Sequence, residues 1–199
     1  MRADSKIRWR RILTGALVWA TISLVVAAID YGTNPQDYTW SFQPIWWLIV
    51  PVALVITPIQ TSCEELFFRG YLMQGMALLT HNKLVLILIN GILFMIPHLG
   101  NPEMQRGPLL GLDYLIAGAM LAAIAIRDNG LELALGIHAA NNLQVILFNT
   151  KDSALPFPSL WYVKVTNEPI IDIIITTLEY SLFYYIFFGR KSDPSLKNQ

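Results

Sequence analysis

A short polar run interrupts a long apolar stretch of the chain. In Glu64-Glu65-Leu-Phe-Phe-Arg69, two adjacent carboxylates precede an arginine. On a helix, Glu65 and Arg69 are four residues apart and share a face, so they can form an ion pair. Glu64 is rotated by about 100° from Glu65, and two neighbouring carboxylates are not both easily charged in an apolar site. The spacing predicts a structural Glu65–Arg69 pair and a free Glu64 that faces a cavity as general base or acid. The alternative is a solvated charge cluster at an interfacial helix end.

Two histidines stand in other apolar stretches. His98 follows Phe94 by four residues, and Asn142 follows His138 by four. A single histidine at a helix end is often only interfacial, and a His–Asn pair can be a structural contact between helices. If these groups meet Glu64, however, a carboxylate, two imidazoles and an amide supply what hydrolysis needs, which is water activation and oxyanion stabilisation.

The composition describes the environment of these residues. Hydrophobic residues make up 54% of the 199 residues and charged residues 14%, whereas soluble proteins have about 25% charged residues. The formal net charge is zero, so nucleic acid is not an expected partner. The single cysteine, Cys63, excludes an internal disulfide and a zinc site built from cysteines. The length indicates one domain, and the lipid bilayer is the expected partner.

Long uncharged stretches predict an all-α, polytopic membrane helix bundle, since about 20 mostly apolar residues cross the hydrocarbon core. Six membrane helices are expected, at residues 12–30, 45–76, 84–99, 109–126, 131–149 and 170–189. The second is too long for one simple crossing, so Pro51 and Pro58 could kink it, or its end could follow the interface. The first exceeds the usual apolar region of a signal peptide, and we expect it to be retained.

The basic residues predict the orientation of these helices. With six crossings, 10 Lys and Arg residues fall on the side of the two termini and 3 on the other, and cytoplasmic loops carry the excess of positive charge. We therefore expect a cytoplasmic N-terminus at 1–11, a membrane domain at 12–189 and a cytoplasmic tail at 190–199. At 1.5 Å per residue, the four polar side chains of the candidate site lie roughly 10–21 Å from their cytoplasmic helix ends. These depths are compatible with one layer within the membrane.

The three motifs, in this order, resemble those of the CPBP intramembrane proteases. This group includes the type II CAAX prenyl endopeptidase and the bacterial Abi or bacteriocin-immunity proteins. The Glu-Glu-x3-Arg motif is at 64–69, Phe-x3-His at 94–98 and His-x3-Asn at 138–142. The resemblance covers about 64–142, and the chain has six predicted helices where the prenyl endopeptidase has eight.

The resemblance implies an intramembrane endopeptidase that acts on a peptide or membrane-protein substrate, here in a bacterial cell membrane. Glu64 and His98 would activate water, His138 and Asn142 would stabilise the oxyanion, and two supporting residues would hold the first motif, Glu65 and Arg69. The family has been described both as glutamic and as metallo-type. We favour the type without a cofactor, because the chain has no His-Glu-x2-His motif. The alternative is a divalent metal such as zinc on Glu64, His98 and His138, with an open fourth position.

Two other functions remain open. In a transporter, the buried Glu and His residues would form a proton or cation path, although no pair of repeats with broken helices is visible. The chain could also be an immunity-type membrane protein that has lost catalysis. The complete set of motifs argues against this alternative. Elsewhere, Asp113 is expected to anchor at the interface, Glu179 to be a hydrogen-bonded structural carboxylate, and the turn at 101–103 to gate or cap the cavity.

Overall fold

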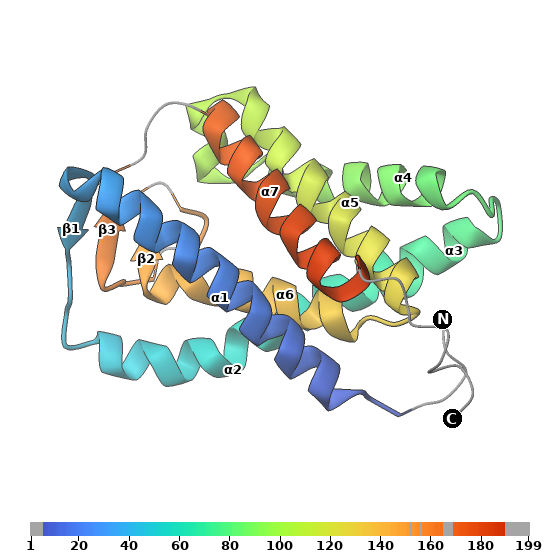
Figure 1. The fold of residues 1–199 in the computed structure, drawn as a ribbon, viewed down its shortest axis with the longest axis horizontal. Helices are drawn as coiled ribbons and strands as arrows, with labels where there is room; N and C mark the ends of the chain where they lie inside the picture. The colour runs from blue at the N-terminus through green and yellow to red at the C-terminus, as the bar shows by residue number, and fades with distance from the viewer. Residues whose placement is uncertain (1–5, 152, 156, 165–168, 190–199) are drawn as a thin grey trace.

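The computed structural model describes residues 6–151, 153–155, 157–164 and 169–189. The expected C-terminal tail at 190–199 and the first five residues of the N-terminal segment lie outside them. Most of the described chain is helical, and its helices form one bundle (Figure 1). The bounds of the α-helices are α1 Trp9–Thr33, α2 Trp46–Glu65, α3 Met73–Ala77, α4 Lys83–His98, α5 Gly111–Asp128, α6 Glu132–Leu143 and α7 Pro169–Phe188.

The bundle is that of an integral membrane protein, as the apolar stretches predict. Within the described residues, four helical segments are long and apolar enough to cross a membrane, Trp9–Thr33, Trp46–Ala77, Leu110–Asp128 and Pro169–Phe188. The helix α4 is apolar but has only 16 residues, and α6 has 12. Six helical segments therefore occur where six are expected, but two of them are shorter than a full crossing.

The second expected helix continues through its two prolines. Its regular α-helical hydrogen bonding changes at the polar run that contains Glu64, Glu65 and Arg69. Pro51 and Pro58 lie inside α2, which passes after Glu65 into a seven-residue π-helix, Leu66–Leu72. A π-helix bonds i to i+5 and often marks a functional site. Asn90 of α4 is fully buried and donates to the carbonyl of Phe68 in this segment at 2.8 Å, which ties the irregular turn to α4.

The fifth expected helix is shorter than predicted. It ends at Leu143, and a 3₁₀ turn, η5 (Gln144–Ile146), leads into the strand β2 (Phe148–Asn149). With β1 (Tyr38–Trp40) and β3 (Trp161–Val163), it forms a three-stranded sheet in the order β1-β3-β2. The strand β3 is antiparallel to β1 and parallel to β2. These strands were not expected, because each has only two or three residues and none repeats a two-residue pattern long enough to recognise.

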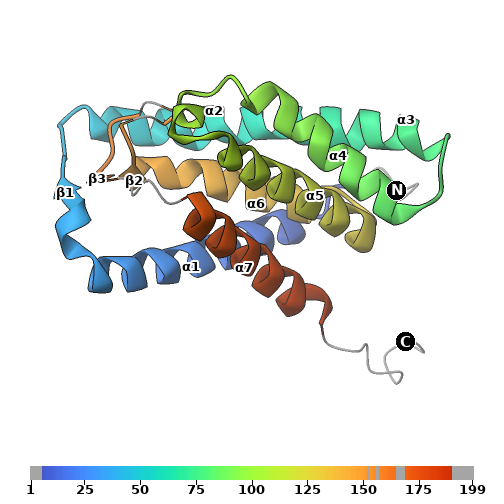
Figure 2. The same ribbon diagram turned by 90° about the horizontal axis from the view of Figure 1, so that it is seen from above.

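Close helix contacts place α6 and α5 inside the bundle. The helix α6 packs between α1 and α2 (Figure 2), and Gly136 lets it approach the backbone of α1 at Ile12. The helix α5 packs along α4, where a Cβ on Gly118 would lie 2.6 Å from the Cβ of Phe94. Small residues permit such approach in membrane bundles. The main core lies among α1, α5, α6 and α7 and includes Trp19, Leu121, Ile124, Leu133, Ile137, Tyr180 and Phe183.

The helices divide the molecule into two ends. The "sheet end" carries the three strands and the connections α1–α2, α4–α5 and α6–α7, whereas the "basic end" carries the start of α1 and the turns α3–α4 and α5–α6 (Figure 1). At the basic end, Arg8 pairs with Asp128 at 2.7 Å and with Glu132 at 2.6 Å, and Arg11 also pairs with Asp128. These contacts join α1 to the turn between α5 and α6.

Candidate active site

Glu65 and Arg69 form the ion pair that their spacing predicts. Glu65 Oε1 lies 2.9 Å from Arg69 Nη1, and both side chains are 0% exposed. Arg69 also donates to the carbonyl of Gly118 on α5 at 3.0 Å and lies 4.6 Å from the ring centre of Phe94 on α4. One buried guanidinium therefore joins three helical segments, and its charge is balanced by Glu65.

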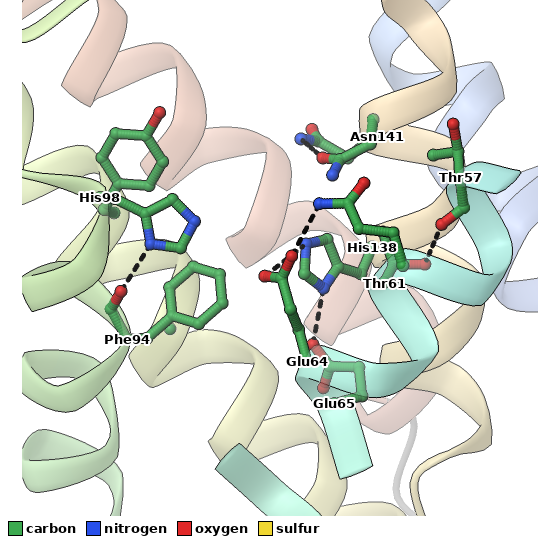
Figure 3. A network of polar contacts seen from close by, with 12 residues as sticks. Thr57, Thr61, Glu64, Glu65, Phe94, His98, His138 and Asn141 are labelled. Carbon is green, nitrogen blue, oxygen red and sulfur yellow. Dashed lines mark hydrogen bonds and ion pairs between the residues drawn. The ribbon is translucent and has the colours of Figure 1, made fainter. Parts of the chain in front are cut away.

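The structure gives Glu65 a second partner that the sequence did not suggest. His138 Nδ1 lies 2.8 Å from the same Oε1 of Glu65 (Figure 3). The ion pair keeps Glu65 charged, and a carboxylate only accepts, so His138 donates its Nδ1 proton to Glu65. Its Nε2 then points away from Glu65, and it lies 3.8 Å from Glu64 Oε2. Glu65 thus fixes the ring of His138 and the nitrogen that faces Glu64.

Glu64 lies on the wall of a cavity, as its rotation from Glu65 predicts. Its Oε1 accepts a hydrogen bond from Gln60 at 2.7 Å, one turn earlier on α2. Its Oε2 is buried and has no hydrogen-bond partner among the described residues. Glu64 is therefore not wholly free, but it keeps one carboxylate oxygen for a ligand or water.

His98 lies at the last residue of α4, on another wall of this cavity. Its Nδ1 is 2.7 Å from the carbonyl oxygen of Phe94, and because a carbonyl only accepts, Nδ1 carries the proton. The neutral ring then has its lone pair on Nε2, which points toward the side where Glu64 and His138 lie (Figure 3). The ring stacks on Tyr114 of α5, with centres 4.4 Å apart, and packs on Phe94 at 4.5 Å.

The last predicted site residue, Asn142, also lines the cavity. A chain of side chains leads to it, in which Trp19 donates to Asn141 at 3.3 Å and Asn141 donates to Asn142 Oδ1 at 3.4 Å. The oxygen of Asn142 is thereby occupied, and its amide nitrogen remains as a donor. The fold thus brings Glu64, His98, His138 and Asn142 to one cavity of about 560 Å³.

Several cavity residues carried no clear sequence signal. Tyr114 and Gln60 stand in apolar helices and belong to none of the three motifs, and the turn at 101–103 was expected to gate or cap the cavity. Asn101 and Glu103 do line it. The Tyr114 hydroxyl donates to Glu103, and the Asn101 amide donates to Tyr114 Oη at 3.0 Å. The ring that stacks on His98 is therefore held by the α4–α5 connection, which lines the cavity.

The other two expected polar sites lie outside this cavity. Asp113 lines a second pocket of about 230 Å³ at the sheet end, together with Arg106 and Asp172, which form an ion pair of 2.6 Å. Glu179 lies on α7 beside Ser23 of α1. Both are placed between helices and not on the cavity wall with Glu64.

The three side chains that could bind a metal in the alternative mechanism, Glu64, His98 and His138, do not form a ligand cluster. Across the described part of the chain, no three His, Cys, Asp or Glu side chains are close enough together to hold a metal ion. Glu64 and His138 are near each other, but His98 belongs to a separate wall formed by α4 and stacks on Tyr114. This geometry does not fit a shared metal on Glu64, His98 and His138.

Two comparisons with known proteins give matches. Residues 41–144 match the family model described as Type II CAAX prenyl endopeptidase Rce1-like. The chain is also 39% identical over 169 residues to the uncharacterized protein YyaK of Bacillus subtilis (strain 168). That alignment covers 82% of this chain and 56% of YyaK, so the chain spans little more than half the length of this relative. No solved structure matches.

The matched segment covers more than half of the chain and contains the π-helix and all three motifs. Side chains from all three motifs, Glu64, His98, His138 and Asn142, line one cavity. The chain belongs to the family of Rce1-like type II CAAX prenyl endopeptidases.

Proposed function

We propose that this chain is an intramembrane endopeptidase that hydrolyses peptide bonds in the 560 Å³ cavity. One observation carries the proposal. Glu64 Oε2 has no hydrogen-bond partner among the described residues, and it lies on a cavity wall shared with the open nitrogens of two histidines. A polar atom without a hydrogen-bond partner is costly inside a membrane bundle. Because the family is one of endopeptidases, we infer that these atoms serve hydrolysis.

Glu64 and His98 are the proposed water-activating groups. A water in the cavity can donate one hydrogen bond to Glu64 Oε2 and the other to His98 Nε2, both of which are acceptors. As the water oxygen bonds to the scissile carbonyl carbon, Glu64 takes one water proton. The same proton then passes to the leaving amine nitrogen as the carbon–nitrogen bond breaks.

His138 and Asn142 are the proposed oxyanion partners. The Asn142 amide nitrogen is a donor, and the contact from Asn141 to Asn142 Oδ1 fixes the orientation of the amide. His138 donates through Nε2 when its ring is protonated, since both ring nitrogens then carry hydrogen. The Glu65 carboxylate at Nδ1 holds the ring in place for this, as a carboxylate does for many catalytic histidines. Removing one oxyanion donor typically lowers the rate by about 10²–10³-fold.

The test is peptide cleavage by the purified protein in detergent. A library of quenched fluorescent peptides would be incubated with wild type, Glu64→Gln, His98→Ala and the control His81→Ala. His81 is exposed in the α3–α4 turn, at the opposite end from the cavity. We expect the two cavity variants to lose about 10²–10⁴-fold in rate, and the control to keep it. A near-wild-type rate for Glu64→Gln would remove the mechanism.

Metal dependence needs a separate measurement. Because the three named ligands do not form a cluster here, the proposed steps use only groups of the chain. We expect cleavage to continue in 1,10-phenanthroline at the wild-type rate. A loss of cleavage that added Zn²⁺ restores would instead support a metal on these residues and contradict the glutamic mechanism.

We also propose an orientation, with both termini on the cytoplasmic side of a bacterial cell membrane. Its support is the charge of the two ends. Six described basic residues lie at the basic end and three at the sheet end, and cytoplasmic segments carry the excess. The six are Lys6, Arg8, Arg10, Arg11, Lys83 and Arg127, and the three are Arg106, Lys151 and Lys164.

A further inference from the structure

The cavity lies toward the sheet end of the bundle. Part of its wall comes from Asn101 and Glu103, in the connection from α4 to α5, and part from residues 153–155, which follow β2. The remaining lining residues come from the helices, the π-segment and η5. Besides the helical segments, only connections at the sheet end line the cavity among the described residues.

A second pocket extends the polar space in the same direction. This pocket of about 230 Å³ shares Glu103, Tyr114 and Ser153 with the cavity. It adds Arg106 and Asp172, an ion pair in which Arg106 is 15% and Asp172 35% exposed. Charged groups thus continue from the cavity wall to solvent-accessible surface at the sheet end.

The opposite direction is filled by side chains. Below Glu64, toward the basic end, Glu65, Arg69 and Asn90 are each 0% exposed. They are engaged with His138, Gly118 and Phe68 respectively. Water or peptide arriving from the basic end would have to break this paired layer before it reached Glu64.

Aromatic side chains also mark the sheet end. A connected series of ring contacts runs from the end of α1 through the sheet to the start of α2. Trp and Tyr concentrate where a membrane meets water. The aromatic series supports a membrane surface at the sheet end, and the lower count of basic residues there supports the proposed extracytoplasmic side. The series consists of Tyr31, Tyr38, Trp161, Trp40, Phe42 and Trp47.

We propose that the active-site cavity opens to the extracytoplasmic side, and that the substrate is an extended polypeptide segment presented at that surface. A prenylated tail of a cytosolic protein lies on the other side of the paired layer and would not reach Glu64. The substrate class rests on the proposed peptidase function, whereas the side of the opening rests only on the fold and its charges.

Cysteine labelling tests the side of the opening without any activity. Cys63 is the single cysteine and is exposed, so Cys63→Ser supplies the background. Ser153→Cys reports the cavity wall, Gln36→Cys the surface of the sheet end, and His81→Cys the basic end. With a membrane-impermeant maleimide on intact cells, we expect the first two to label and His81→Cys to label only after permeabilisation. Labelling of His81→Cys alone would overturn the orientation. Labelling of Gln36→Cys but not Ser153→Cys would overturn the open cavity.

Vesicles of defined orientation test the substrate class. Quenched fluorescent casein would be added outside right-side-out and inside-out vesicles containing wild type or Glu64→Gln. We expect wild-type cleavage only in right-side-out vesicles, at least tenfold above Glu64→Gln. Cleavage confined to inside-out vesicles overturns the inference. If neither cleaves while Ser153→Cys labels from outside, the proposed peptidase function and the substrate class fail, and the side of the opening stands.

Discussion

Two adjacent glutamates lie in opposite surroundings. Glu65 is 0% exposed and contacts Arg69 and His138, whereas Glu64 lines a cavity and keeps one oxygen without a hydrogen-bond partner among the described residues. In a bilayer, an ionised side chain is costly unless it is paired. The paired layer around Glu65 therefore stabilises the bundle, and the cavity wall around Glu64 holds polar atoms that the folded chain does not use. This difference predicts which substitutions change activity and which change stability.

The largest expected effect is on activity, at Glu64. In Glu64→Gln the side chain keeps its size and its contact with Gln60, but it loses the ability to take a proton from water. We expect peptide cleavage to fall about 10²–10⁴-fold. The melting temperature in detergent should hold or rise, because functional groups are often placed at a cost in stability. A clear drop in melting temperature, as large as that of Glu65→Gln, would contradict the division between the two glutamates.

The next effect is on stability, at the buried pair. Glu65→Gln leaves Arg69 as a buried charge without its carboxylate, and Arg69→Met leaves the buried carboxylate of Glu65 with only the contact to His138. Breaking a buried pair usually costs about 3–5 kcal/mol, which we expect to see as lower melting temperatures and folded yields. The double variant should recover part of the loss, because neither charge is then stranded. If the double variant lost more stability than the two single variants together, the ion pair would not explain the losses.

The sequence predicted the helices and the motif pairs because both rest on local spacing. Apolar stretches set the approximate positions of the helices, and the four-residue spacing set the Glu65–Arg69 pair, since neighbouring turns of one helix decide both. The contact between Glu65 and His138 was not predictable in this way. It joins residues 73 positions apart, and it depends on how closely α6 packs against α2.

The features that sequence reasoning missed depend on the tertiary structure. The π-helix at Leu66–Leu72 is as apolar as an α-helix would be, and the carbonyl of Phe68 accepts from Asn90 of another helix as well as from the backbone N–H of Met73. The early end of α6 at Leu143 leads into the pairing of β2 with β3, in which Phe148 lies opposite Trp161, 13 residues farther along the chain. Tyr114 became a site residue only because α5 packs along α4 and brings its ring against His98.

A smaller effect on activity is expected at Tyr114, which touches the cavity group His98 and is itself held by Glu103. Tyr114→Leu removes the stacked ring, and Tyr114→Phe removes only the hydroxyl contact. Aromatic pairs contribute about 0.5–1.5 kcal/mol, so we expect kcat to fall about 3–10-fold in Tyr114→Leu, with KM nearly unchanged. Tyr114→Phe should fall less. Equal losses in the two variants would assign the effect to the hydroxyl and Glu103, and not to the stack on His98.

The smallest effect is expected at the basic end, where ion pairs are partly solvated. Arg8 Nη2 lies 2.6 Å from Glu132 Oε2, and the Arg8 side chain is 22% exposed. Both residues lie outside the four candidate spans. We expect Arg8→Met to cost about 1 kcal/mol, well below the cost at Arg69. Arg10→Met is the matched control, since Arg10 is exposed on the first turn of α1 and loses the same charge.

The pH dependence separates this pair from a general charge effect. The hydrogen bond from Arg8 lowers the pKa of Glu132 from 4.5 to about 2. A carboxyl whose pKa is lower in the folded state stabilises it above the unfolded pKa, and this contribution disappears as the pH falls through the folded pKa. The difference in melting temperature between wild type and Arg8→Met should therefore be full at pH 7 and shrink between pH 4.5 and 2, while Arg10→Met stays close to wild type throughout. A difference that stays constant over that range, or an equal loss in Arg10→Met, would show that the Arg8–Glu132 contact does not stabilise the join between α1 and the α5–α6 turn.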